Sequence, residues 1–347
     1  MKKEKYNEIR FDRRSFIKNL GFISTYALFP TTIFKNYMKA GTDKYIETPY
    51  KKALTGPCAS IRTPFNKEGD INYEALHKQI DFVINSGTRS IILTYGDSLF
   101  TLLTDDEIAK LTRACSKYIK KRVMLVAATG KWWTGKTVDF ASFSVEAGAD
   151  MLMVLPPDWA HSCTVDTLVQ HYAAASKHIP VMVVTNYLGS HSESFALKVI
   201  KSLYEQVPGV VALKDDVGGE LVRKICLMTH ERWALIAGGL LQNHMNMLPY
   251  GVDGFFSMHI LFYPAIAWKY WDAIKADKIE DAVSIIRDYD MPLFDLLRSF
   301  EGGFDAGIHG TLEILGFGKR YRRMPYQTIT ENDMQKLKNF LQSKGYI

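Results

Sequence analysis

Eight short apolar runs, each followed by a stretch with helical periodicity, are the feature that most limits how this chain of 347 residues can fold. The expected strands are Gly56–Thr63, Ser90–Tyr95, Val123–Ala128, Met151–Leu155, Val181–Thr185, Val210–Lys214, Trp233–Ala237 and Gly254–Ser257. The expected helices among them are Tyr73–Ser86, Asp106–Ile119, Val138–Ala147, Val165–Lys177, Ser194–Glu205, Glu220–His230 and Leu241–Tyr250. Eight strands that alternate with helices predict an α/β fold, a (β/α)8 TIM barrel, because an open doubly wound sheet normally needs fewer units.

Three segments with different patterns predict the domain organisation. Residues 1–50 are expected to be a leader, and residues 51–278 are expected to form the barrel. Residues 279–347 contain no strand-like run, and their apolar residues recur at three- and four-residue spacing, so they predict C-terminal helices packed on the barrel.

The leader carries almost all of the net charge. Its ten Lys/Arg and five Asp/Glu residues contribute +5 of the formal +6, which leaves +1 for the rest of the chain. Arg13 and Arg14 precede Phe16 and Lys18, and the apolar run that follows, residues 20–30, is shorter than the roughly 20 residues that span a bilayer. This order is typical of a signal peptide, and its RRxFxK pattern resembles a twin-arginine (Tat) signal. We therefore expect export to the periplasm or cell surface and no membrane attachment afterwards, with an ordinary basic helix start as the alternative.

The composition excludes several classes of partner and cofactor. With 47% hydrophobic and 23% charged residues the chain is typical of a globular protein, and a body with a charge of +1 predicts no nucleic-acid-binding face. The four cysteines lie far apart, which predicts buried thiols and neither a disulfide framework nor a zinc site. Asp215 and Asp216 could bind a metal as a pair, but no other ligands converge on them in the sequence, so we expect no metal and no organic cofactor.

The stretch VVALKDDVGGE places Lys214 at the end of the sixth apolar run. Barrel active sites lie where the strands end, and burial there favours an uncharged amine that can attack a carbonyl. From the pattern alone, a strand-end lysine paired with Asp215 or Asp216 remains an equal alternative.

The order of several segments resembles the dihydrodipicolinate synthase/N-acetylneuraminate lyase family of class I aldolases. These segments are ASIRTPFNKEGDINYEAL, LLTDDE, EAGADMLMVLPPDW, GVVALKDDVG, GVDGFFS and YRRMP, and the likeness covers about residues 54–341. In that family a lysine at the end of strand six, in a pattern like iKdssGd, forms a Schiff base with a 2-oxo acid. Lys214 matches this position, so the resemblance implies that it is catalytic.

The chain departs from the family where the substrate carboxylate binds. The family carries a GTTGE motif after strand two, whereas counting back from Glu107 gives Tyr95-Gly96-Asp97-Ser98-Leu99 here. Asp97 would repel a carboxylate, at a cost of about 4 kcal/mol for a separation of about 4 Å. Ser98 could still donate a hydrogen bond, and Asp97 could serve as acid or base or bind sugar hydroxyls.

A second departure falls on strand five. The family reads P-x-x-x-YN, with a tyrosine that transfers protons, whereas PVMVVTNYLG places Thr185 before the matching asparagine. Thr185 is a poor acid or base alone, so Tyr187 could supply the phenol, or it could be a packing aromatic.

Three further side chains are candidates for substrate contact: Trp132 after strand three, Trp159 in PPDW, and His191 in the loop after strand five. A ring of Trp132 could stack on a sugar or on a neighbouring subunit.

These features predict a Schiff-base-forming lyase or aldolase that acts on a 2-oxo acid or sugar-derived small-molecule carbonyl substrate. The alternative is a non-catalytic protein that binds a sugar acid on the same barrel. Relatives are usually dimers or tetramers, which implies a homodimer or homotetramer.

Overall fold

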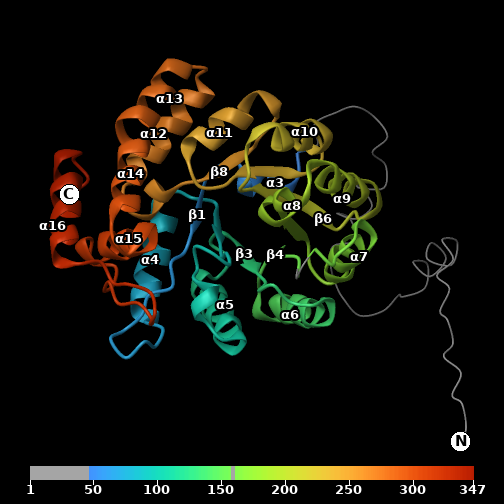
Figure 1. The fold of residues 1–347 in the computed structure, drawn as a ribbon, viewed down its shortest axis with the longest axis horizontal. Coiled ribbons are helices and arrows are strands. Elements are labelled where there is room, and N and C mark those ends of the chain that lie inside the picture. The colour runs from blue at the N-terminus through green and yellow to red at the C-terminus, as the bar shows by residue number, and fades with distance from the viewer. Residues whose placement is uncertain (1–46, 158–160) are drawn as a thin grey trace, which may run out of the picture. The chain divides into compact units, whose positions relative to one another are not determined.

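A computed structural model describes residues 47–157 and 161–347, and the leader predicted from the sequence lies outside these residues. Eight parallel strands close into a barrel in sequence order, with β1 paired to both β2 and β8 (Figure 1). They are β1 (Gly56–Ser60), β2 (Ser90–Ile92), β3 (Met124–Ala128), β4 (Met151–Val154), β5 (Val181–Val184), β6 (Val210–Asp215), β7 (Ala234–Ala237) and β8 (Gly254–Phe256). The predicted TIM barrel is confirmed.

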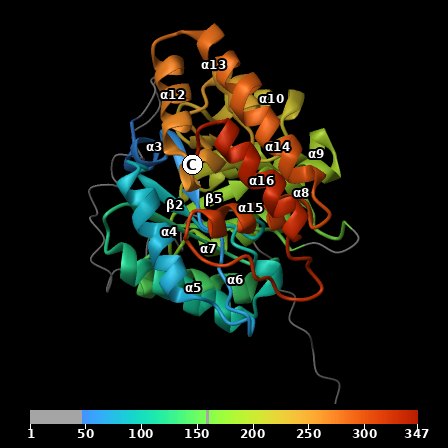
Figure 2. The ribbon, with the colours of Figure 1, turned by 90° about the vertical axis from the view of Figure 1, so that its left-hand side faces the viewer.

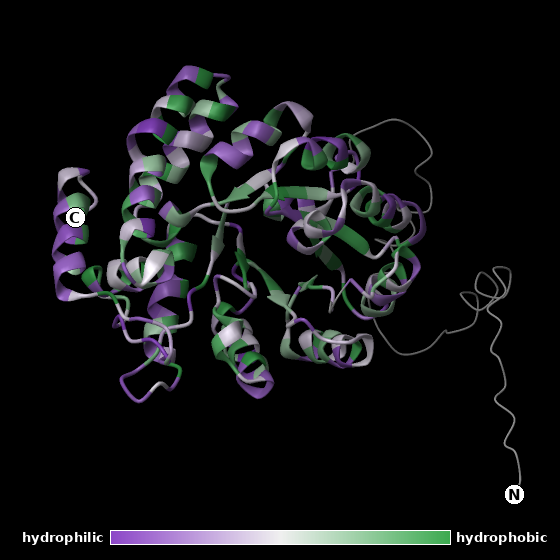
Figure 3. Cartoon of the chain, in the orientation of Figure 1, coloured by the Kyte–Doolittle hydropathy of each residue, from purple (hydrophilic) through white to green (hydrophobic). Residues whose placement is uncertain are grey.

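Helices surround the strands and bury their outer faces (Figure 1). They are α3 (Pro49–Leu54), α4 (Tyr73–Asn85), α5 (Asp105–Ile119), α6 (Thr134–Ala147), α7 (Val165–Ala175), α8 (Thr185–His191), α9 (Glu193–Gln206), α10 (Gly219–Thr229), α11 (Leu241–Met247) and α12 (Pro264–Lys275). Short 3₁₀ turns occur at Phe100–Leu102, Leu248–Tyr250 and Met258–Leu261. Most strand residues are fully buried because both faces are covered, which explains the continuous apolar runs in the sequence (Figure 3).

The chain ends in helices α13 (Ile279–Ile285), α14 (Met291–Ser299), α15 (Gly303–Ile314) and α16 (Glu331–Ser343), with a π-helical turn at Ile286–Asp290 between α13 and α14. Helix α15 packs against both α14 and α16 (Figure 2). No helix in the described part of the chain is both long and apolar enough to cross a membrane.

Helix α15 lies within the segment predicted to form C-terminal helices, although glycine is unfavourable within helices. Its glycines permit close packing: a Cβ on Gly307 would meet Leu297 and Phe300, and a Cβ on Gly310 would meet Met334 and Ile329. Tertiary contacts therefore outweigh the weak helical propensity of GGFDAGIHG.

The segment after β5 also differs from the prediction. Thr185 was expected at the end of a strand and His191 in a loop, but both belong to α8. Only four residues of this run pair as a strand, and Thr185 begins the helix.

Three buried histidines make the fold sensitive to acid. Burial lowers the pKa of His171 to about 4 and that of His244 to about 3, and burial together with Arg62 and Arg322 lowers the pKa of His309 to about 3. The unfolded chain binds protons at these sites below about pH 6.5 while the folded chain does not, so stability falls as the pH falls. At pH 5 each histidine should cost about 2 kcal/mol relative to pH 7.

We expect urea denaturation at pH 7 and pH 5 to show this loss. A His309→Phe variant should lose about 2 kcal/mol less than the unmodified protein between these two values. If the variant and the unmodified protein lose the same free energy of unfolding between pH 7 and pH 5, His309 is not neutral in the folded state.

Candidate active site

Lys214 lies at the C-terminal end of β6, where it pairs in register with Val184 of β5 and Ile236 of β7. Its side chain forms an ion pair with the carboxylate of Asp216, and its Nζ lies 4.9 Å from the ring centroid of Phe256 at the end of β8. The residue is 8% exposed, so it is largely desolvated. Of the alternatives left open by the sequence, the structure contains the ion pair with Asp216, at the C-terminal end of the barrel.

Asp97 follows β2, on the opposite side of the barrel from β6. Burial would raise the pKa of its carboxyl, but the positive charges of Arg62 and Lys214 and a hydrogen bond from Ser60 outweigh burial and lower that pKa. Strands β2 and β6 lie four strands apart in the closed barrel. The electrostatic interaction between Asp97 and Lys214 therefore acts across the C-terminal end of the barrel.

Arg62 is a counterion for Asp97 that the sequence analysis missed. It follows β1 in ASIRTPF, is 1% exposed, and places Nη2 3.0 Å from Asp97 Oδ1. Its Nη1 donates to Asp305 Oδ1 at 2.7 Å, and its guanidinium lies 5.5 Å from the Phe304 ring centroid. A charged residue in an otherwise apolar strand end was the available signal, because a buried cation requires partners.

Helix α15 thus contributes to the site through Asp305, whose second oxygen lies 3.9 Å from Arg322 Nη2. From the sequence alone, Asp97 is expected to repel a substrate carboxylate as an isolated charge. The structure instead places Asp97 in a network of alternating charges that links β1, β2 and α15.

The backbone at Gly238 packs closely against Asp216, the partner of Lys214. A Cβ on Gly238, which follows β7, would collide with the Asp216 carboxylate and with the Asp215 carbonyl oxygen. Glycine at this position therefore allows the Lys214–Asp216 ion pair to form.

Thr185 connects α8 to the end of β6. Its hydroxyl donates to Asp215 Oδ1 at 2.7 Å and accepts from the Asp216 backbone N–H at 2.9 Å. The Asp215 carboxylate also accepts from the N–H groups of Val217 and Gly218. Burial raises the pKa of Asp215 although these hydrogen bonds oppose the shift. This arrangement orients the segment that carries Lys214 and Asp216.

We expect Thr185→Val to lower the free energy of unfolding by about 2 kcal/mol, because it removes one of the hydrogen bonds to the buried Asp215 carboxylate and leaves the Asp216 N–H without its acceptor. Thr185→Ser keeps both hydrogen bonds and should lose less than half as much. Urea denaturation measures the difference. If Thr185→Val leaves stability unchanged, Thr185 does not have this positioning role.

Ser98 faces the protein interior. Its hydroxyl donates to the Ile61 carbonyl at 2.8 Å and accepts from the Thr94 N–H at 3.1 Å, and the residue is fully buried. These bonds join the segments that carry Arg62 and Asp97.

The remaining candidates lie on segments that follow β3 and β5. Tyr187 and His191 are on α8, where His191 stacks on Phe195 of α9 at a centroid distance of 3.9 Å. Burial raises the pKa of Tyr172 on α7, and the proximity of Tyr187 adds to this rise. Trp132 packs edge-on against Phe140 of α6 at 5.0 Å. Trp159 lies outside the described residues.

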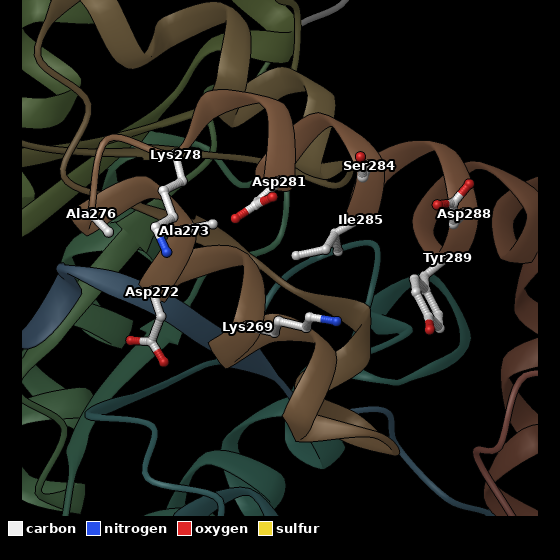
Figure 4. Close-up of a pocket in the computed structure, with 10 residues that line it drawn as sticks. All are labelled: Lys269, Asp272, Ala273, Ala276, Lys278, Asp281, Ser284, Ile285, Asp288 and Tyr289. Atoms are coloured by element: carbon white, nitrogen blue, oxygen red, sulfur yellow. The ribbon is translucent and has the colours of Figure 1, made fainter.

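A surface hollow of about 550 Å³ lies away from Lys214, between α12, α13 and the π-helical turn (Figure 4). Its lining has mixed charge, with Lys269 and Lys278 beside Asp272, Asp281 and Asp288. It contains none of the residues at the C-terminal end of the barrel. Within the described residues no three His, Cys, Asp or Glu side chains form a group that could hold a metal ion.

The family model for the dihydrodipicolinate synthetase family matches residues 53–344. The chain belongs to this family. Its members are lyases of the class I aldolase type, which confirms the expected enzyme class at the level of the family.

The names of the similar proteins refer to more than one reaction. A 4-hydroxy-tetrahydrodipicolinate synthase of Lachnoclostridium phytofermentans is 34% identical over 165 residues, which are 47% of this chain and 55% of the relative. A synthase with the same name from Syntrophus aciditrophicus is 26% identical over 84% of this chain and 99% of its own. A protein of a Bradyrhizobium species, named a probable 5-dehydro-4-deoxyglucarate dehydratase, is 24% identical over 79% of this chain and 88% of its own.

Among solved structures, dihydrodipicolinate synthase from Oceanobacillus iheyensis superposes with a TM-score of 0.76 at 19% identity, covering 86% of this chain and 99% of that one. This likeness supports the fold. The comparisons name enzymes and do not support the non-catalytic alternative.

Proposed function

We propose that the protein is a Schiff-base lyase in which Lys214 condenses with the carbonyl group of a 2-oxo acid or sugar-derived substrate. The position of Lys214 carries the proposal: the residue is largely buried at the C-terminal end of β6, where its amine pairs with Asp216 of the segment that follows and interacts electrostatically with Asp97, which follows β2. Membership of the family and the position of Lys214 in GVVALKDDVG support it.

Asp216 accepts the proton that Lys214 must lose before it can react, because its carboxylate is the direct partner of the ammonium group. The amine then attacks the carbonyl carbon, and the carbinolamine loses water to give an iminium ion. When the substrate bond breaks, its electron pair moves toward the iminium nitrogen to form an enamine. Asp97, which Arg62 and Lys214 hold ionised, takes the proton released from a substrate hydroxyl in this proposal.

Reductive trapping tests this proposal. The purified protein is incubated with pyruvate, 2-oxo sugar acids and hydroxylated ketones, each with and without sodium borohydride, and its intact mass is measured. We expect a borohydride-dependent addition that peptide mapping places on Lys214. Reversible binding without any reduced adduct would contradict a Schiff-base mechanism.

We also propose that residues 1–50 direct export through the twin-arginine route and that the mature protein is a homodimer or homotetramer. The RRxFxK pattern supports the first part. Fractionation of cells that produce the natural chain and an Arg13→Lys/Arg14→Lys variant tests export, and light scattering of the purified protein tests assembly.

A further inference from the structure

We propose that Asp216 carries both protons that pass from the amine nitrogen of Lys214 to the substrate carbonyl oxygen when the imine forms. One carboxylate then takes the part that the family assigns to a tyrosine on strand five. This inference rests on the proposed function, and it adds the group that drives the loss of water.

Asp216 contacts the reacting nitrogen directly. Within residues 47–157 and 161–347, its Oδ1 is the only hydrogen-bond partner of Lys214 Nζ, which also lies 4.9 Å from the ring centroid of Phe256. An apolar ring cannot exchange protons. The oxygen of a carbinolamine is separated from Nζ by one carbon atom, so a carboxylate bonded to Nζ is within reach of that oxygen as well.

The spacing in Lys214-Asp215-Asp216 gives the two carboxylates different surroundings. Side chains two residues apart lie on the same side of an extended chain, and Asp216 pairs with Lys214. The Asp215 carboxylate is fully buried and accepts hydrogen bonds from the Thr185 hydroxyl and from two backbone N–H groups of the following loop. Asp216, with 27% of its side chain exposed, is the one that a substrate can reach.

Thr185 and Tyr187, the candidates from the segment after β5, are engaged elsewhere. Thr185 is fully buried, and it donates its one hydroxyl proton to Asp215 Oδ1 at 2.7 Å. The ring of Tyr187 lies edge-on to that of His191, with the centroids 5.9 Å apart. In the part of the chain that the structure describes, neither side chain is hydrogen-bonded to the Lys214 amine.

Imine formation moves two protons from nitrogen to oxygen. The ammonium group of Lys214 gives one proton to Asp216, which passes it to the carbonyl oxygen as the nitrogen bonds to the carbonyl carbon. The nitrogen then gives a second proton to Asp216, which passes it to the new hydroxyl group. The C–O bond breaks, its electron pair leaves with water, and the nitrogen lone pair completes the C=N bond. Asp216 ends ionised, as it began, and the positive charge passes from the ammonium group to the iminium ion.

The rate of imine formation with pyruvate tests this role. Sodium cyanoborohydride is added in excess, where the rate of adduct formation on Lys214 no longer depends on the reductant and imine formation limits it. Asp216→Asn keeps the shape of the side chain but cannot carry a proton, and it should lower this rate at least about 100-fold. Glu220→Gln removes an exposed carboxylate of α10 and should change the rate less than about twofold. If pyruvate gives no adduct, the panel member that reacts fastest replaces it.

Formate distinguishes proton transfer from a structural role of Asp216. Asp216→Ala leaves space for a small carboxylate beside Lys214, whereas the amide of Asp216→Asn fills that space. Formate should raise the rate of Asp216→Ala at least about tenfold and that of Asp216→Asn less than about twofold. Urea denaturation shows which variants are folded, and either folded variant is sufficient for the test.

The outcomes separate this inference from the proposed function. A loss of at least about 100-fold in Asp216→Asn, or rescue of a slow Asp216→Ala variant by formate, supports the inference. A smaller loss in Asp216→Asn, or a slow Asp216→Ala variant that formate does not rescue, overturns it and leaves the Schiff-base proposal standing. If the natural protein forms no adduct with pyruvate or with any other member of the panel, both are overturned.

Discussion

A Lys214→Arg variant is expected to form no borohydride-stable adduct and to lose at least about 10³-fold in turnover of any substrate that the natural protein cleaves. Arginine keeps a positive charge beside Asp216, but it remains protonated and cannot act as the amine nucleophile. Turnover is followed through the carbonyl product. Adduct formation is followed by intact mass.

The variant also separates chemistry from folding. Because the ion pair with Asp216 can persist, the free energy of unfolding should change by less than about 1.5 kcal/mol. A folded Lys214→Arg protein that retains more than about a tenth of the natural turnover would contradict the catalytic role of Lys214.

Replacement of Arg62 by leucine should lower the free energy of unfolding by about 3 kcal/mol, which is the largest effect on stability that we expect at the site. The guanidinium is buried and serves two carboxylates, so its removal leaves Asp97 and Asp305 without their shared partner. The estimate is at the low end for buried ion pairs, since the two carboxylate side chains are 29% and 37% exposed and water can solvate them.

A double variant tests whether the pairing itself is responsible. Arg62→Leu/Asp97→Asn should be more stable than Arg62→Leu alone by about 1 kcal/mol, because one of the two uncompensated charges is removed. Denaturation with urea at pH 7 is measured for the natural protein, the two single variants and the double variant. Additive effects of the two substitutions would show that Arg62 and Asp97 are not coupled.

The barrel could be predicted from the sequence because its strands are buried on both faces and therefore appear in the sequence as short runs of apolar residues. The boundaries were less predictable where a tertiary contact decides them. Thr185 illustrates this, since its side chain bonds to the end of β6 and it begins a helix, although its own sequence context suggests a strand. The glycines of helix α15 show another effect of tertiary contacts, since they reduce helical propensity but permit close packing.

The site was predictable in part for a similar reason. Lys214 and Asp97 could be singled out because each departs from its local pattern or from the resembling family. Their environment could not be predicted, because Arg62, Asp305 and Arg322 come from three distant segments that only the fold brings together. An isolated Asp97 suggests repulsion, whereas Asp97 beside Arg62 forms part of a balanced network.

A crystal structure of the protein incubated with a hydroxylated ketone and reduced with borohydride would be the most direct measurement of whether Lys214 forms the covalent intermediate. We expect continuous electron density from Nζ of Lys214 to the former carbonyl carbon, with Asp216 displaced from its ion pair and Asp97 still bound to Arg62. Density for an unattached ligand beside an intact Lys214–Asp216 pair would contradict this expectation.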